Sequence, residues 1–308
     1  MSIPAPPPPP FTPMPGPHPL TYLSIYLSIL SYRSSPPPPP APHISKNPSI
    51  NHTQQTESKG HALVLLTSVL GATTNWLVLR WLHAQLSSSS AEEPAAVVLV
   101  SFMRDGAFWR EGAAKLGLDL EAMRRRRRFA FVDGLTGLFV SPPENGPPDR
   151  ILDSADLAAV MAGITAALDK DIDVAPRTVL IIDQIDALVA TTGLASQAVQ
   201  SALLPLRERV DTTVLTLAAD DPLIHTQTTR LEREHASLVL SHAHAARTVV
   251  ALRRLDSGPA PDVSGVIRIS SRRRHPFDGQ DDVPLPPDAE YLYHVAADWS
   301  VTVFERGA

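Results

Sequence analysis

Short, almost continuous apolar runs alternate with amphipathic stretches between His61 and Leu217. An apolar run of this kind is typical of a parallel strand whose two faces are both covered by helices. The alternation therefore predicts βαβ units and an α/β fold, with a mostly parallel central sheet flanked by helices. The predicted strands are Ala62–Thr67, Ala96–Phe102, Arg128–Val132, Thr178–Asp183 and Thr212–Ala218.

Helical periodicity fills the intervals between these runs. Apolar residues recur at helical spacing from Leu157 to Leu168, and Asp153 or Ser154 is the expected N-cap of that helix. Pro205 falls inside another predicted helix and should kink or break it. The predicted helices are Asn75–Leu86, Ala107–Leu116, Asp153–Leu168 and Ala195–Val210.

The C-terminal part of the chain has strand-like segments and little predicted helix. We expect its strands to add antiparallel to one edge of the sheet. Two proline-rich or basic segments, Ser141–Pro148 and Arg272–Pro287, are expected to be exposed, mobile loops. The predicted strands here are Ser237–Ser241, Arg247–Leu252, Gly265–Ser270, Glu290–Val295 and Ser300–Phe304.

Residues 1–60 differ from the rest because they contain proline runs at Pro6–Pro10 and Pro36–Pro40. Proline removes a backbone donor and fixes φ, which favours solvated polyproline II over packed structure. The apolar stretch Leu20–Tyr32 is shorter than the roughly 20 residues of a membrane-spanning helix, and no Lys or Arg precedes it. We therefore expect a poorly ordered extension at 1–60 and one domain at 61–308. A proline-rich ligand for a partner, or a mispredicted translation start, would also explain this segment.

The composition excludes several kinds of site. The 308 residues include no Cys, which rules out a disulfide framework, a thiolate zinc site and a Cys nucleophile. The formal net charge of −5 argues against a protein dedicated to coating nucleic acid, although a local basic patch remains compatible with it. His235, His242 and His244 lack the ligand spacing of a metal site, and no G-x-S-x-G elbow indicates a hydrolase, so we expect neither.

The loop after the first strand has the position of a phosphate-binding loop without its chemistry. A functional loop reads G-x-x-x-x-G-K-[ST], in which glycines free the backbone amides and a Lys neutralises phosphate. Ser68 falls at the first Gly of that pattern, and Thr74 (or Thr73 in a register shifted by one) falls at the Lys. The sequence thus predicts a degenerate phosphate loop, no nucleotide cofactor and a role in assembly. The predicted loop residues are Ser68, Gly71, Ala72, Thr73, Thr74 and Asn75.

Asp183 ends an apolar strand, as does the Asp that orients magnesium in phosphate-loop enzymes. Many buried strands end in Asp, and magnesium usually needs substrate phosphates as further ligands. With no Lys in the loop, we expect no metal. The alternative role for Asp183 is a polar strand end or the N-cap of a helix over 184–190.

Five consecutive arginines form a basic run between a predicted helix and a predicted strand. Such a run can contact the phosphate backbone of RNA. It can equally be a solvated turn at a helix end, where cations suit the helix dipole, and Arg272–Arg274 allows the same two interpretations. The residues of the run are Arg124, Arg125, Arg126, Arg127 and Arg128.

Four aromatic residues lie in the first two predicted helices. Bulky rings beside a degenerate loop favour packing, either inside the domain or against a neighbour. These residues are Trp76, Trp81, Phe108 and Trp109.

Several of these stretches resemble the fungal form of the Elongator complex protein 6 family. The resemblance includes LLTSVLGATTNWLVLRWL at Leu65–Leu82 and TVLIIDQIDALVATTG at Thr178–Gly193. Together the matching stretches cover most of residues 62–307, in the same order, whereas 1–60 lie outside. The others are Val100–Leu120, Phe129–Phe139, Leu231–Ser270 and Tyr291–Gly307.

The resemblance implies a RecA-like ATPase fold without a functional Walker A loop. It also implies a hetero-hexameric ring with Elongator proteins 4 and 5, two copies of each, that binds tRNA. That ring supports modification of the wobble uridine at carbon 5, while a different subunit performs the chemistry. The implied location is cytoplasmic and nuclear, with no membrane partner. No catalytic residue, cofactor or metal is carried over to this chain.

Two other functions remain open from the residues. One is an independent ATPase with an unusual phosphate loop. The other is a direct RNA-binding module that uses Arg124–Arg128. The loops around Asp133–Phe139 and Ser141–Pro148 are candidates for contact with ring neighbours.

Overall fold

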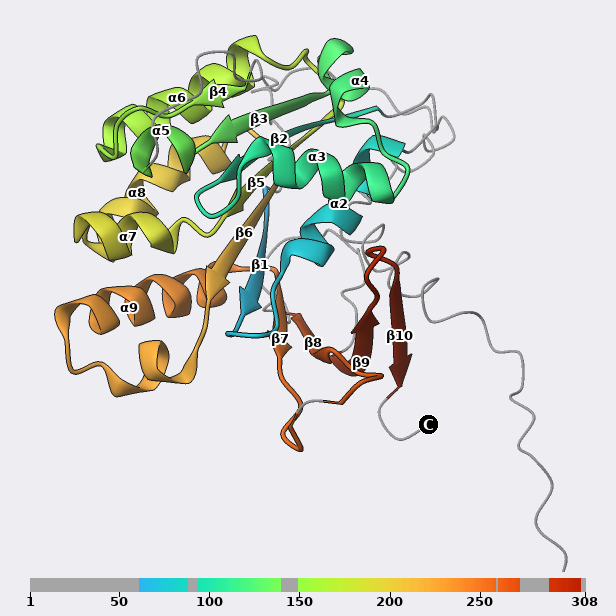
Figure 1. Cartoon of the computed structure of the whole chain (residues 1–308). Helices are drawn as coiled ribbons and strands as arrows, with labels where there is room; N and C mark the ends of the chain where they lie inside the picture. Colours follow the sequence, from blue (N-terminus) through green and yellow to red (C-terminus); the bar gives the residue numbers. More distant parts are fainter. Residues whose placement is uncertain (1–60, 88–93, 140–148, 259, 272–287, 306–308) are drawn as a thin grey trace, which may run out of the picture.

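The computed structural model describes residues 61–87, 94–139, 149–258, 260–271 and 288–305. Within these ranges one ten-stranded sheet runs through the molecule in the order β10-β9-β8-β7-β1-β6-β5-β2-β3-β4 (Figure 1). The strands are β1 (Ala62–Ser68), β2 (Ala95–Ser101), β3 (Phe129–Asp133), β4 (Arg150–Ile151), β5 (Arg177–Asp183), β6 (Thr212–Ala218), β7 (Thr248–Arg253), β8 (Gly265–Ser271), β9 (Ala289–Val295) and β10 (Val301–Glu305).

The strands from β7 to β4 along this order are parallel, and β8, β9 and β10 continue the sheet antiparallel. This arrangement confirms the predicted α/β class with antiparallel C-terminal strands. The helices are α2 (Asn75–Ser87), α3 (Gly106–Lys115), α4 (Leu120–Arg125), α5 (Thr136–Phe139), α6 (Leu157–Lys170), α7 (Asp186–Thr192), α8 (Ser196–Arg207) and α9 (Arg230–Ala245), with the π-helix η1 at Pro222–Thr226.

Two cores lie on opposite faces of the sheet because side chains alternate along each strand. In β1, Val64 and Leu66 face the core under α2, α3 and α4, where β8, β9 and β10 also contribute. Leu63 and Leu65 face the other core, under α6, α7, α8 and α9. The three layers are visible in Figure 1. Burial of both faces explains why the parallel strands read as continuous apolar runs.

Two helix predictions differ in detail from the structure. Pro205 does not break α8, which continues to Arg207, three residues short of the predicted end at Val210. Asp156, rather than Asp153 or Ser154, caps α6, because its carboxylate accepts the Ala159 amide at 3.1 Å. The Ser154 hydroxyl accepts the Asp156 amide at 3.1 Å in the turn that precedes the helix.

The strand predicted at Ser237–Ser241 was also wrong, because these residues lie inside α9. A capping box starts this helix, with Thr229 accepting the Glu232 amide and Glu232 accepting the Thr229 amide. Since α9 is a crossover helix between β6 and β7, the strand predicted at Arg247–Leu252 is parallel to β1 rather than antiparallel.

Three sequence predictions fall on residues outside the described ranges: the extension at 1–60 and the loops at 141–148 and 272–287. Among the residues that the structure does describe, no helix is both long and apolar enough to span a bilayer.

Candidate functional site

The carboxyl ends of β1, β6, β5 and β2 meet at one edge of the sheet (Figure 1). Open α/β sheets bind their ligands at this edge, in the crevice formed by the loops that follow the strands. The degenerate loop follows β1 here, and Asp183 ends β5. This edge is therefore the candidate site, and its loops decide what the site can hold.

The loop between β1 and α2 is a tight β-turn. The Ala72 amide donates to the Val69 carbonyl at 2.8 Å, and the two residues form an antiparallel bridge. Gly71 has φ of +88°, the left-handed conformation that a type II turn requires at its third position. A phosphate-binding loop is wide and turns its amides inward, whereas this turn closes on itself.

A carboxylate stands at this loop where a bound phosphate would need positive charge. The Leu70 amide donates to Oδ1 of Asp220 at 2.7 Å, and the Ala219 amide donates to the Ser68 carbonyl at 2.7 Å. Two of the loop's backbone groups are thus bound to the segment after β6. A carboxylate at this position would repel phosphate.

The remaining predicted loop residues supply no cation. Ala72 and Thr74 are buried, and the Thr74 carbonyl accepts the Val78 amide in the first turn of α2. Thr73 is exposed, and Asn75 is the first residue of the helix. The structure brings together the six residues predicted as a degenerate phosphate loop, but it shows a β-turn and a helix start.

Gly71→Ala tests the turn directly. The left-handed φ strains any L side chain, and a Cβ here would lie 3.4 Å from Cδ of Arg254. We expect the free energy of unfolding to fall by about 1–2 kcal/mol, measured by urea denaturation. The matched comparison is Gly117→Ala, which has a similar left-handed φ of +79° and no atom within 4 Å of the added Cβ, so it should show the loss that comes from φ alone. An unchanged stability for Gly71→Ala would contradict the strained turn.

Asp183 is completely buried at the end of β5. Its Oδ2 accepts the hydroxyl of Ser101 at 2.8 Å, and its Oδ1 accepts the hydroxyl of Thr216 at 2.7 Å. Burial raises the pKa of Asp183, while these two hydroxyls and the charge of Arg104 oppose the rise. The predicted N-cap role was wrong, since α7 begins at Asp186 and no side chain caps it.

Gln184 completes this network and had no signal in the sequence. Its backbone has φ of +57°, and its amide donates to the hydroxyl of Thr216 at 2.9 Å. Its side-chain Nε2 reaches the hydroxyls of Ser68 at 3.4 Å and Thr216 at 3.3 Å. The Gln184 side chain therefore bridges the ends of β5, β6 and β1, where a nucleotide-binding protein would leave a crevice.

Among the described residues, no group of three His, Asp or Glu side chains could hold a metal ion. Asp183 is completely buried and each of its oxygens accepts a hydroxyl, so it faces no open position for a metal. His235 and His242 are buried on α9, where their ring nitrogens bond the carbonyls of Ala218 and Leu238, each at 2.8 Å. These histidines have structural partners.

Asp186 and His235 form a buried pair next to this network, and no motif in the sequence indicates it. Nδ1 of His235 lies 3.9 Å from Oδ2 of Asp186, which also accepts the Ala218 amide at 3.1 Å. Burial raises the pKa of Asp186 to about 6, against the opposing effects of the Ala218 amide and His235. The other oxygen, Oδ1, is buried and has no hydrogen-bond partner in the described part of the chain.

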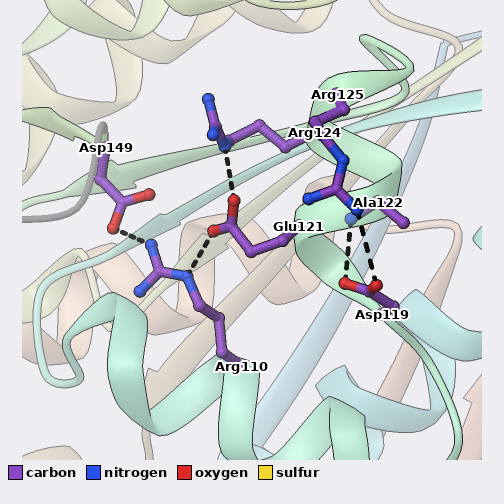
Figure 2. Close-up of polar contacts among 7 residues, drawn as sticks. All are labelled: Arg110, Asp119, Glu121, Ala122, Arg124, Arg125 and Asp149. Atoms are coloured by element: carbon purple, nitrogen blue, oxygen red, sulfur yellow. Dashed lines mark hydrogen bonds and ion pairs between the residues drawn. The ribbon is translucent and has the colours of Figure 1, made fainter.

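The arginine run lies at the opposite ends of the strands, near their amino ends, because it joins the end of α4 to the start of β3. Figure 2 shows how its first members are held. Nε of Arg124 donates to Glu121 at 3.0 Å, and Glu121 also accepts Nε of Arg110 at 2.8 Å. Arg110 in turn pairs with Asp149, which is nearly buried and whose pKa is raised by that burial. Arg124 therefore belongs to a charge network that joins α3, α4 and the start of β4.

The other members of the run differ in how firmly they are held. Arg127 pairs with Asp173 and donates to the Lys170 carbonyl at 2.6 Å, while Arg128 donates to the Ala95 carbonyl at 3.2 Å. Arg125 is exposed and forms a long ion pair with Asp119, at 3.8 Å. The guanidinium of Arg126 is exposed with no partner among the described residues. Arg126 is thus free to meet a ligand, and Arg125 would have to break only a long, exposed ion pair.

A groove of about 460 Å³ lies at this same edge, lined by His61, Asp173, Val174, Glu208 and Asp211 among others. Carboxylates outnumber cations along it, so it does not extend the arginine run into a basic surface. Neither the groove nor the run lies near the degenerate loop.

The aromatic residues of α2 and α3 pack internally. Trp76, Trp81 and Trp109 are buried in the core under these helices. Phe108 is partly buried, with its ring edge-on to Trp109 and Trp299 at centroid distances of 5.2 and 5.7 Å. Packing inside the domain, one of the two predicted alternatives, is confirmed for the three tryptophans.

Two comparisons with known proteins identify the family of this chain. The model of the family described as Elongation complex protein 6 matches residues 46–295. The chain is also similar to "Elongator complex protein 6 homolog" from the fission yeast Schizosaccharomyces pombe, with 25% identity over 193 residues, which are 63% of this chain and 72% of that protein. Because the family model spans most of the sequence, including every parallel strand and the β-turn after β1, the chain belongs to the Elongation complex protein 6 family.

Proposed function

We propose that this chain is a non-catalytic, RecA-like subunit of Elongator that assembles with Elongator proteins 4 and 5 in a hetero-hexameric ring. The ring binds tRNA and supports modification of the wobble uridine at carbon 5, in the cytoplasm and the nucleus. Family membership supports the assignment to Elongator. The ring, its partners and its tRNA ligand are what the resemblance implies for this chain.

One observation carries the non-catalytic part of the proposal. The loop after β1 is a closed turn whose Leu70 amide is bound to the carboxylate of Asp220. Nucleotide hydrolysis needs amides and a cation aimed at the phosphates, with magnesium held by an open carboxylate. Here the Leu70 and Ala72 amides are already bound, no residue of the turn is a cation, and Asp183 is sealed by two hydroxyls.

The purified chain alone is therefore expected to hydrolyse no ATP above background. The check is a phosphate-release assay with ATP and magnesium, run beside Asp183→Ala. Hydrolysis by the wild-type chain that disappears in Asp183→Ala would overturn the proposal and favour an independent ATPase. Equal background rates for both proteins would support it.

Assembly is tested by co-expression with Elongator proteins 4 and 5 and mass measurement of the intact complex. We expect a species with two copies of each chain. If this chain, co-expressed with both partners, is purified with neither of them bound, the ring is contradicted.

Direct contact with tRNA would depend on Arg125 and Arg126, because the other three arginines of the run make shorter contacts within the chain, while Arg125 has only a long, exposed ion pair. Replacing both by Ser in the assembled ring is expected to lower tRNA affinity. The slope of log affinity against log salt should also fall by up to about 2, since each phosphate contact contributes roughly 0.7–0.9. Lys115→Ser is the control, because Lys115 is an exposed cation of α3 that pairs with Glu111. An unchanged slope would reject a phosphate contact by the run.

A further inference from the structure

Leu70 is 83% exposed at the tip of the turn between β1 and α2. A large apolar side chain at this position gains nothing from the fold of the isolated domain. Leu204, Leu231 and Leu240 are also exposed, but they lie on helices and are roughly half covered. Leu70 lies at the carboxyl ends of the strands, where α/β proteins bind their ligands, and it is more exposed than Met103 (48%), which follows β2 there.

The backbone that carries Leu70 is held on three sides. Its own amide is bound to Asp220, the Ala72 amide closes the turn onto Val69, and the Ala219 amide fixes Ser68 at the end of β1. A side chain on a fixed backbone loses little conformational entropy when it enters a partner. The turn therefore presents Leu70 as a preorganised contact.

The charges next to the turn indicate what kind of surface would cover it. The exposed Arg254, which follows β7, lies against Gly71, and it has no hydrogen bond or ion pair among the described residues. The nearby carboxylate of Asp220 is already bound to the Leu70 amide. A complementary partner would place an apolar socket over Leu70 and a carboxylate beside Arg254. Phosphate fits this surface poorly, because Asp220 stands at the turn.

We propose that the Val69–Ala72 turn is a contact between this chain and a neighbouring subunit, with Leu70 in an apolar socket and Arg254 paired with a carboxylate of that neighbour. The inference rests on the proposed function, since the neighbour is a subunit of the proposed ring. The loop that would cradle phosphate in a nucleotide-binding protein has here become a protein-binding element.

The test uses the full chain co-expressed with the two ring partners, and measures dissociation of the purified complex on dilution by mass photometry. Leu70→Ala is expected to weaken the association of this chain by at least about tenfold, because a buried Leu side chain contributes that much or more. Leu70→Met keeps the volume and should stay within about threefold of wild type. Val174→Ala is the matched control, since Val174 is fully exposed at the opposite edge of the sheet.

Arg254→Ala is a second, independent test of the contact. Loss of a charge pair at the rim of an interface is expected to flatten the salt dependence of association. Thermal melting of each isolated variant accompanies these measurements, and it should match wild type because the Leu70 and Arg254 side chains are exposed.

Three outcomes would overturn the inference. Equal dissociation of the Leu70→Ala and Val174→Ala complexes would show that the ring forms without this contact. Self-association of the isolated chain that disappears in Leu70→Ala would assign the turn to a second copy of the chain. A wild-type chain that joins neither partner would overturn the proposed function and this inference together.

Discussion

Trp81→Ala is expected to lower the free energy of unfolding by about 3–5 kcal/mol, the usual loss when a large aromatic side chain is removed from a core. Trp81 is 1% exposed on α2 and lies in the core that this helix shares with α3 and the sheet. Removal of the indole leaves a cavity that the surrounding strands cannot fill without moving. The measurement is urea denaturation of the isolated chain, with the slope m unchanged if only stability is affected.

Trp81→Phe is the matched variant. The buried Nε1 of Trp81 has no hydrogen-bond partner in the described part of the chain, so phenylalanine loses volume but no polar contact. We expect it to cost no more than about half as much as alanine, since most of the ring is kept. Equal losses for both variants would mean that the indole nitrogen has a partner that contributes stability. Little loss for either would place Trp81 outside the core.

The parallel half of the sheet was predictable because its strands are buried on both faces. Leu63 to Leu66 contact helices above and below, so selection for apolar residues at every position leaves a continuous run. The same signal misled at Ser237–Ser241, where Leu238 and Val239 are buried as part of a helix rather than a strand. A short apolar run cannot separate these cases, but Thr229 and Glu232 have the spacing of a capping box and would have indicated a helix.

The sequence predicts which phosphate-binding groups the candidate site lacks, but not how the site is closed. The absence of Lys near Thr73 and Thr74 can be read from the chain, whereas the closure of the crevice cannot. Asp183 is sealed by Ser101 and Thr216, which lie 82 and 33 positions away in the sequence. These hydroxyls meet only after β2, β5 and β6 have paired, so no local pattern indicates them.

The arginine run shows the same limit. Five adjacent cations look equivalent in the sequence, but their partners come from other elements. Arg127 meets Asp173 from the segment after α6, and Arg128 meets the Ala95 carbonyl at the start of β2. A run that suggests one binding surface is therefore divided between members that hold the fold and members that face solvent.

The buried pair of Asp186 and His235 predicts a pH dependence of stability. The folded-state pKa of Asp186 is raised by burial to about 6, above the ordinary value of 3.8. The folded state thus prefers the protonated carboxyl, and this contribution to stability is complete below pH 4 and is lost as the pH rises through 6. The shift corresponds to about 3 kcal/mol, at about 1.4 kcal/mol for each pH unit.

Asp186→Asn isolates this effect because asparagine keeps the shape of the side chain and does not titrate. Its carbonyl oxygen can still accept the Ala218 amide that Oδ2 of Asp186 accepts at 3.1 Å. We expect the difference in unfolding free energy, wild type minus variant, to fall by about 2–2.5 kcal/mol between pH 4 and 7 and then to level off. Urea denaturation at pH 4, 5, 6, 7 and 8 measures it, and other carboxylates cancel in the difference. A flat difference would mean that the ionised carboxylate gains a further partner in the folded state, and the unpartnered Oδ1 is the atom where that partner would have to be found.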